Sequence, residues 1–122
     1  MSTTLEREVV LPAVEPVAPE EPPEIGVLRA ARELLSDPTR WCQAQYARDA
    51  AGKSVQPDNL AARQYCAAGA LEWAAGDINE QYVAARIRLS LALGNLGVAE
   101  ANDSYGGYER IMRGLDKALE GF

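Results

Sequence analysis

Cys66 is the residue of this sequence best suited to covalent chemistry. It lies in the stretch ARQYCAAGALEWAAGD, residues 62–77, among alanines and a glycine. A cysteine becomes a nucleophile when a base, a helix N-terminus or a nearby cation lowers the pKa of its thiol. The sequence contains no histidine, the commonest base, and Arg63 is the only cation in this stretch. We therefore expect Cys66 to be a small structural residue, and a reactive thiol is the alternative.

The element that carries Cys66 is predicted to be a helix over residues 59–75. Proline, aspartate and asparagine at 57–59 are typical of a helix start, and Gly76 is typical of a helix end. The residues between are apolar nearly all round, which is typical of a buried helix. Cys66 would then lie about two turns into the helix, beyond the reach of the helix dipole. A serine in its place should cost about 1–3 kcal/mol of stability, because it would bury an unpaired hydroxyl.

Three further helices and a hairpin complete the predicted fold. Apolar residues at helical spacing predict helices over 25–35, 77–97 and 108–122. The piece QYARDAAGKSV, residues 45–55, predicts a strand, a tight turn and a short strand. The fold class is therefore mainly α. We expect a compact four-helix domain with a small β-hairpin between its first and second helices, and an extended N-terminal tail rich in proline and glutamate.

The helix over 77–97 carries two apolar stripes. Asp77 as N-cap, followed by Glu80, resembles a capping box. The first stripe is Tyr82, Ala85, Leu89 and Leu96, and the second is Val83, Ile87 and Leu91. We expect this helix to be sandwiched between other elements, and a face presented to a partner chain is the alternative.

The net charge of −6 is concentrated at the N-terminus. Residues 1–24 hold six glutamates, one arginine and five of the seven prolines, so they are predicted to be an acidic extended tail. Residues 25–122 form the single helical domain. In the tail, Val9, Val10, Leu11 and Val14 could dock on a partner protein, and a solubilising leader is the alternative.

The charge and hydropathy of the chain also bear on its partners and location. The body carries 12 acidic and 11 basic residues, and the basic ones are scattered, so nucleic-acid binding is not expected. No apolar run is long enough to cross a membrane, and the N-terminus does not resemble a signal peptide. We expect a cytoplasmic protein with both thiols reduced.

The segments RWCQAQYARDAAGKSV, YCAAGAL and AEANDSYGGYERIMRGLDKAL resemble a small, uncharacterised domain family of bacterial and phage genomes. The pattern of that family has a Trp-x-Gln-Gly stretch, a Cys-x-x-Gly-Ala-Leu helix and an aromatic-Asn-Asp loop before a terminal helix. The matching residues are Trp41, Gln43, Cys66, Gly69, Ala70, Leu71, Asn102 and Asp103. Ala44 stands where the pattern has glycine, and Ala101 stands where it has an aromatic residue. The resemblance covers residues 25–120 and implies no activity.

The matching polar residues are the candidate binding residues. Trp41, Gln43, Cys66, Asn102 and Asp103 could converge on one site for a small ligand or a partner. In the alternative, Asn102 and Asp103 cap the last helix or shape its loop. No catalytic residue, metal ligand set or cofactor is predicted, because Cys-x-x-Cys, His-based and glycine-rich phosphate motifs are all missing from the sequence.

These observations favour a non-catalytic accessory factor that binds another protein. Such a factor could be encoded by a phage or mobile element and act as an inhibitor or an assembly component. The alternative is a small-ligand-binding protein or a thiol-dependent enzyme that uses Cys66 and Asp103. Self-association into a homo-oligomer stays open.

Overall fold

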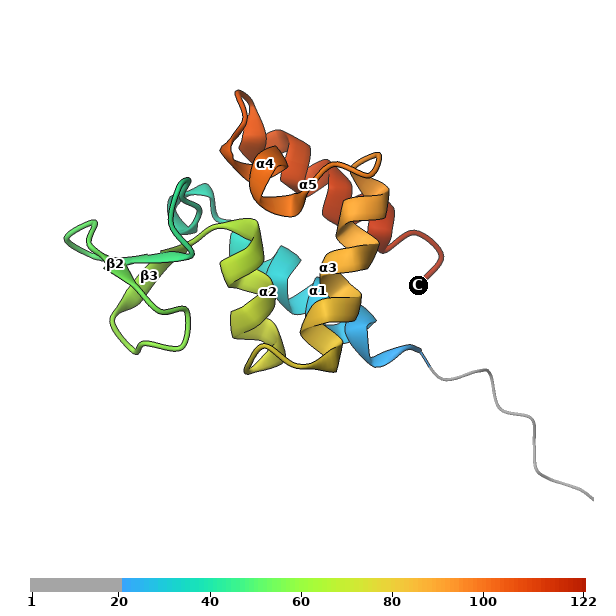
Figure 1. Ribbon diagram of the computed structural model, residues 1–122, viewed down its shortest axis with the longest axis horizontal. Coiled ribbons are helices and arrows are strands. Elements are labelled where there is room, and N and C mark those ends of the chain that lie inside the picture. Colours follow the sequence, from blue (N-terminus) through green and yellow to red (C-terminus); the bar gives the residue numbers. More distant parts are fainter. Residues whose placement is uncertain (1–20) are drawn as a thin grey trace, which may run out of the picture.

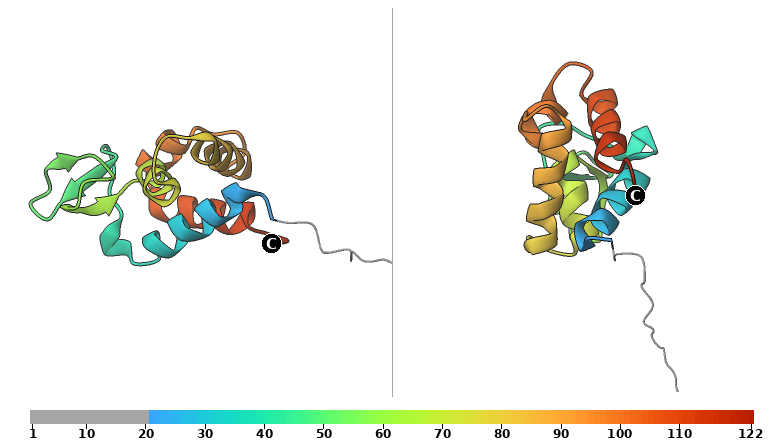
Figure 2. Two further views of the ribbon diagram at one scale, coloured as in Figure 1. Left: turned by 90° about the horizontal axis from the view of Figure 1, so that it is seen from below. Right: turned by 90° about the vertical axis from the view of Figure 1, so that its right-hand side faces the viewer.

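The computed structural model describes residues 21–122 and is mainly α-helical. The elements in chain order are α1 (Pro23–Leu35), a 3-10 turn (Pro38–Arg40), β1 (Ala47–Asp49), β2 (Ser54–Val55), β3 (Ala62–Tyr65), α2 (Ala67–Ala75), α3 (Glu80–Ala92), α4 (Val98–Asp103) and α5 (Gly107–Ala118). Figures 1 and 2 show the small sheet projecting from one end of the helical bundle, while the start of α1 and the C-terminus lie at the other end. The predicted fold class is confirmed, with five helices in the described part of the chain where four were expected.

The sheet has three antiparallel strands in the order β2-β1-β3. The hairpin of β1 and β2 was predicted from the turn residues between them, and Ala47 pairs with Val55 in it. β3 was missed, because residues 59–65 were expected to form the first half of a helix. Instead, Asn59 accepts a hydrogen bond from the Ala61 amide in a turn, and β3 then pairs with the free edge of β1.

α2 is a buried helix with small side chains in its first half, as predicted, but it begins at Ala67 and not at residue 59. All of its residues from Ala67 to Leu71 are buried. A Cβ atom added to Gly69 would stand 1.9 Å from the carbonyl oxygen of Tyr46. The glycine therefore allows the helix backbone to pack directly on the backbone before β1. Gly76 ends the helix in the left-handed region with φ 85°, as predicted.

The core lies between α1, α2, α3 and α5. Its largest fully buried side chains come from all four helices: Ile25, Leu28, Leu35, Leu71, Leu89, Ile111 and Leu115. α1 lies at the centre of this arrangement, since it packs against each of the other three.

The domain begins earlier than the predicted boundary between residues 24 and 25. Pro23 occupies the first turn of α1, where a proline is tolerated because its missing N–H would have no partner. Glu24 forms an ion pair with Arg88 of α3 at 2.8 Å, and Glu21 forms one with Arg29 at 2.6 Å. Residues 21–24 therefore belong to the folded body. The predicted docking residues Val9, Val10, Leu11 and Val14 lie outside the described residues.

α3 is covered on one side only. Tyr82, Ala85 and Leu89 are buried, as the first predicted stripe requires. The second stripe is exposed: the fraction of accessible surface is 49% for Val83, 56% for Ile87 and 62% for Leu91. The prediction of a sandwiched helix is therefore wrong, because the described elements leave these three side chains about half exposed. The N-cap is Asn79 and not Asp77, since the Asn79 carboxamide oxygen accepts from the Tyr82 amide at 3.0 Å.

None of the helices in residues 21–122 has the length and apolar character that a membrane span requires.

Candidate functional site

Four of the five residues predicted to form a site, Trp41, Gln43, Asn102 and Asp103, meet where the loop over 41–46 lies against the end of α4. The indole N–H of Trp41 donates to the Asn102 side-chain oxygen at 2.7 Å. The Gln43 amide donates to the carbonyl oxygens of Asn102 at 3.0 Å and Ser104 at 3.1 Å. The Asp103 carboxylate accepts from the backbone N–H of Ala44 at 2.9 Å. These hydrogen bonds hold the 41–46 loop against the end of α4.

Asn102 is the centre of this cluster and is fully buried. Its side-chain oxygen accepts a second hydrogen bond, from the Ala67 amide at 2.8 Å. Its side-chain nitrogen donates to the carbonyl of Cys42 and to Asp103 Oδ1, both at 3.0 Å. A carboxamide offers two donors and two acceptors, so every site is occupied and none is left for a ligand.

Asn102 and Asp103 therefore lie at the C-terminal end of α4 and not in a loop. Together with Trp41 and Gln43, they form the hydrogen-bonded cluster that is called here the clamp. The alternative prediction was that they cap the last helix or shape its loop. The capping role is wrong, because the N-cap of α5 is Gly106, without a side-chain cap. The clamp joins the 41–44 loop, the start of α2 and the end of α4. The sequence indicated which residues take part. In the structure, their hydrogen bonds go to each other and to nearby backbone groups.

Cys66 is the N-cap of α2, and its placement two turns inside a helix was wrong. The cause is β3, which ends at Tyr65 and leaves the next residue at the helix start. The Cys66 sulfur accepts from the Gly69 amide at 3.3 Å, and the side chain is buried. Burial raises the pKa of the Cys66 thiol, although backbone N–H groups at the helix start lower it. The thiol therefore stays protonated at neutral pH.

This position reverses the expectation for a serine at residue 66. Serine is a preferred N-cap and its hydroxyl can accept from the Gly69 amide, so Cys66→Ser should change the unfolding free energy by less than about 1 kcal/mol. Cys66→Ala removes the acceptor and should cost about 1–2 kcal/mol. Urea denaturation of both variants tests this order. A serine variant less stable than the alanine variant would show that Cys66 acts as a buried apolar residue and not as a cap.

The other cysteine of the chain is equally protected. Cys42 is buried, and burial raises the pKa of its thiol to about 11. Its thiol donates to the carbonyl oxygen of Gln45 at 3.6 Å. In the part of the chain that the structure describes, no three histidine, cysteine, aspartate or glutamate side chains gather as a metal site would require.

Ala44 has a backbone conformation that explains the glycine at its position in the family pattern. Its φ is 71°, in the left-handed region, which costs an alanine about 1–2 kcal/mol. Ala44→Gly should therefore raise the unfolding free energy by up to about 1 kcal/mol, after the greater flexibility of glycine in the unfolded chain is deducted. Ala50→Gly, at an exposed turn residue, is the matched control and should destabilise. A melting temperature that falls equally in both variants would contradict this account of Ala44.

A small cavity opens beside the clamp. Its volume is about 260 Å³, and it is lined by Ala44, Gln45, Tyr46, Cys66, Ala99 and Asp103. Small-molecule sites usually have volumes of roughly 300–1,000 Å³ and a few polar groups free to bind the ligand. Here the Cys66 sulfur and one Asp103 oxygen are already engaged with backbone N–H groups. The cavity therefore offers little to a ligand.

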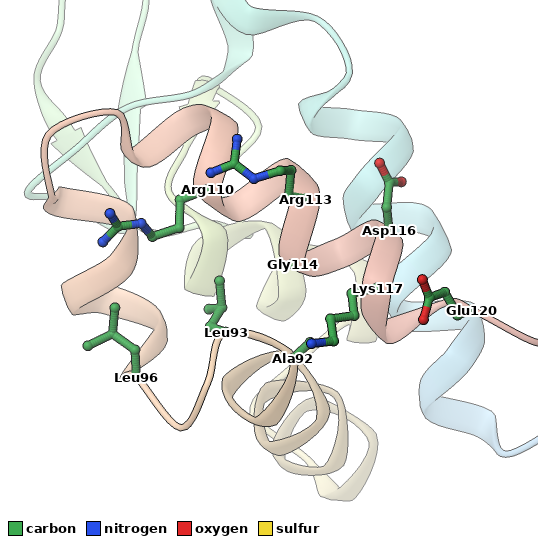
Figure 3. Close-up of a pocket in the computed structure, with 9 residues that line it drawn as sticks. All are labelled: Ala92, Leu93, Leu96, Arg110, Arg113, Gly114, Asp116, Lys117 and Glu120. Atoms are coloured by element: carbon green, nitrogen blue, oxygen red, sulfur yellow. The ribbon is translucent and has the colours of Figure 1, made fainter.

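Two surfaces remain outside the hydrogen-bonded cluster. The first is the α3 outer face, which consists of the exposed residues Val83, Ile87 and Leu91. It is the second apolar stripe of the sequence prediction. The second is a groove between α5 and the C-terminal end of α3, shown in Figure 3 and called here the cationic groove. The charged residues that line it all come from α5: the cations Arg110, Arg113 and Lys117, and the carboxylates Asp116 and Glu120. The spacing of the three cations, three and four residues apart, is a signal in the sequence that could have indicated this surface.

A family model, described as a family of unknown function (DUF6197), matches residues 19–121. The match extends over nearly the whole described body, including the clamp and both surfaces. No curated protein and no solved structure matches the chain.

Proposed function

We propose, for a chain that belongs to the family of unknown function DUF6197, a role as a non-catalytic domain that binds another protein through the α3 outer face. The observation that carries this proposal is the exposure of Val83, Ile87 and Leu91, which ranges from 49% to 62%. Exposed apolar residues that occur singly are normal, but three on successive turns of one helix are typical of an interaction surface.

The shape of this surface suits a segment of a partner. The three side chains follow one line along α3, about 12 Å long at 1.5 Å per residue. A mostly apolar groove of about 300 Å³ runs beside Val83 and Ile87, and its wall is completed by Tyr82, Arg86, Ser90, Gly97 and Val98. A stable contact between two whole domains usually needs about 20–30 residues on each side. A narrow apolar line with a groove beside it fits a helix or an extended segment better than a second globular copy.

The charges beside the α3 outer face favour protein over nucleic acid. Arg88 forms an ion pair with Glu24, and Arg86 donates to the Tyr82 hydroxyl at 2.6 Å. Both guanidinium groups thus already have a partner within the fold. We place the protein in the cytoplasm with both thiols reduced, as an accessory factor such as an inhibitor or an assembly component.

The clamp supports a non-catalytic role. The Asn102 carboxamide has no unused hydrogen-bonding group, and burial raises the pKa of the Cys66 thiol. A thiol-dependent enzyme needs the opposite shift. The groups that could have supplied chemistry are thus engaged in holding the fold.

Binding by the α3 outer face can be tested with one substitution and a matched control. Ile87→Asp should abolish the retention of partner proteins by the immobilised full chain, because it puts a charge at the centre of the apolar line. Leu60→Asp changes a leucine that is 95% exposed in a turn outside α3, and should leave the retention unchanged. Both variants should keep the melting temperature of the wild type within a few degrees, because neither side chain is buried.

Two outcomes would contradict the proposal. Partners retained equally by wild type and Ile87→Asp would remove the α3 outer face from binding. A wild-type dimer in sedimentation that Ile87→Asp converts to monomer would make the partner a second copy of the chain, in place of the segment proposed here.

A further inference from the structure

The cationic groove lies on a different side of α3 from its outer face and has a volume of about 530 Å³. Its apolar floor is formed by Ala92, Leu93, Leu96 and Gly114. In Figure 3, Lys117 extends toward Ala92 at the end of α3, and Arg110 extends on the side of Leu96. Asp116 and Glu120 also line the groove. The groove thus combines an apolar floor with three cations and two carboxylates.

The cations of the groove are not neutralised by the described part of the chain. Within residues 21–122, Arg110, Arg113 and Lys117 form no ion pair with any carboxylate. Of the two carboxylates that line the groove, Asp116 is paired with Arg32 of α1 at 2.7 Å. Lys117 extends toward the C-terminal end of α3, where a cation is favourable, but this does not account for the two arginines. Like charges on one side of a helix repel, so the arrangement favours an acidic occupant.

One segment of this chain has the complementary chemistry. Residues 6–15, EREVVLPAVE, contain three glutamates, one arginine and the apolar residues Val9, Val10, Leu11 and Val14. The segment offers carboxylates for the arginines and aliphatic side chains for the floor. A second copy of the whole domain offers no comparable match, since its body is almost neutral.

The position at which this segment joins the body allows it to reach the groove. Glu21 pairs with Arg29, and Arg29 also donates to the Phe122 carbonyl at 2.8 Å, just beyond the end of α5. From Phe122 back to Arg110, α5 and its end extend about 18 Å at 1.5 Å per residue. Residues 16–20 can span up to about 17 Å, and residues 6–15 up to about 33 Å more. A tether this short gives an effective concentration on the order of millimolar.

We propose that residues 6–15 bind in the cationic groove of their own molecule, with carboxylates on Arg110 and Arg113 and aliphatic side chains on Leu93 and Leu96. This inference does not rest on the binding of a partner by the α3 outer face. It assigns the acidic tail to an intramolecular site on α5, which a competing acidic segment would have to displace.

The test uses the full chain with a nitroxide at Thr4→Cys, next to the proposed segment. Cys42 and Cys66 are buried, so the label reacts with the introduced thiol. Amide NMR relaxation should be enhanced several-fold more at Leu93, Leu96 and Gly114 than at Gly52 in the hairpin. The enhancement should be unchanged by dilution and should fall at an ionic strength of about 1 M, where the screening length is about 3 Å.

Variants with reversed charges test whether the arginines of the groove hold the segment. Arg110→Glu with Arg113→Glu should abolish the enhancement in the groove, and Arg40→Glu, an exposed cation next to the sheet, should not. Three results would overturn the proposal: equal enhancement in the groove and the hairpin, enhancement that persists after the double reversal, or enhancement that appears only when labelled chains are mixed with unlabelled ones. The last would mean that the segment binds another copy.

Discussion

Replacing Asn102 with alanine should lower the free energy of unfolding by about 3–5 kcal/mol, the largest loss expected from any single side-chain truncation in the clamp. The substitution leaves the buried amide of Ala67, the carbonyl of Cys42 and the indole N–H of Trp41 without their partners. Each buried polar group without a partner costs roughly 1–3 kcal/mol. Urea denaturation followed by tryptophan fluorescence measures this loss, since Trp41 is itself part of the clamp.

Asn79→Ala is the matched control for this measurement. Asn79 is a half-buried N-cap whose oxygen accepts from the Tyr82 amide, so its loss should cost only about 1 kcal/mol. If the two variants are destabilised equally, the clamp does not hold the fold together. A fully stable Asn102→Ala protein with lost partner binding would instead make Asn102 a functional residue.

Gly69→Ala should lower the free energy of unfolding about as much as Asn102→Ala, for a steric reason. Its Cβ would stand 1.9 Å from the Tyr46 carbonyl oxygen and 2.8 Å from the carbonyl carbon, and both are backbone atoms that cannot rotate away. α2 would have to move away from the segment before β1, which breaks the hydrogen bond from the Cys66 amide to the Tyr46 carbonyl. We expect a loss of roughly 3 kcal/mol or more, at or above the upper end for overpacking.

The same substitution at Gly26 provides the control, because that glycine also lies in a helix. A Cβ at Gly26 of α1 would meet nothing within 4 Å. Gly26→Ala should therefore stabilise the protein by about 0.5–1 kcal/mol through the better helix propensity of alanine. Thermal unfolding of the two variants should shift in opposite directions. A Gly69→Ala protein that melts with the wild type would show that α2 does not pack on this backbone.

Local signals made much of the fold predictable from the sequence. α1 and α5 have clear helical periods, and the turn between β1 and β2 has typical turn residues, so these elements are where they were expected. β3 was missed because its alanine, arginine and glutamine favour a helix locally, and its strand conformation comes from pairing with β1. That pairing is a tertiary contact that no local pattern contains.

The residues of the candidate site could be predicted from the sequence, but what their polar groups bind could not. Trp41 and Gln43 lie 61 and 59 positions before Asn102, and the family pattern indicated that the three matter together. Whether their polar groups bind a ligand or each other depends on distances that the sequence does not give. The change in the role of Cys66 followed from the error at β3, since a strand that ends at Tyr65 makes the next residue a cap.

We propose that Cys66, like the clamp residues beside it, serves the fold and does no thiol chemistry. The alkylation rate of Cys66 in the native full chain tests this proposal most directly. Peptide mapping by mass spectrometry after timed exposure to iodoacetamide at neutral pH gives this rate separately from that of Cys42. Because the side chain is only 6% exposed and burial raises the pKa of its thiol, we predict a reaction at least about 100-fold slower than that of an unhindered peptide thiol. A Cys66 that reacts as fast as such a thiol, or faster, would contradict the account and favour a thiol-dependent function.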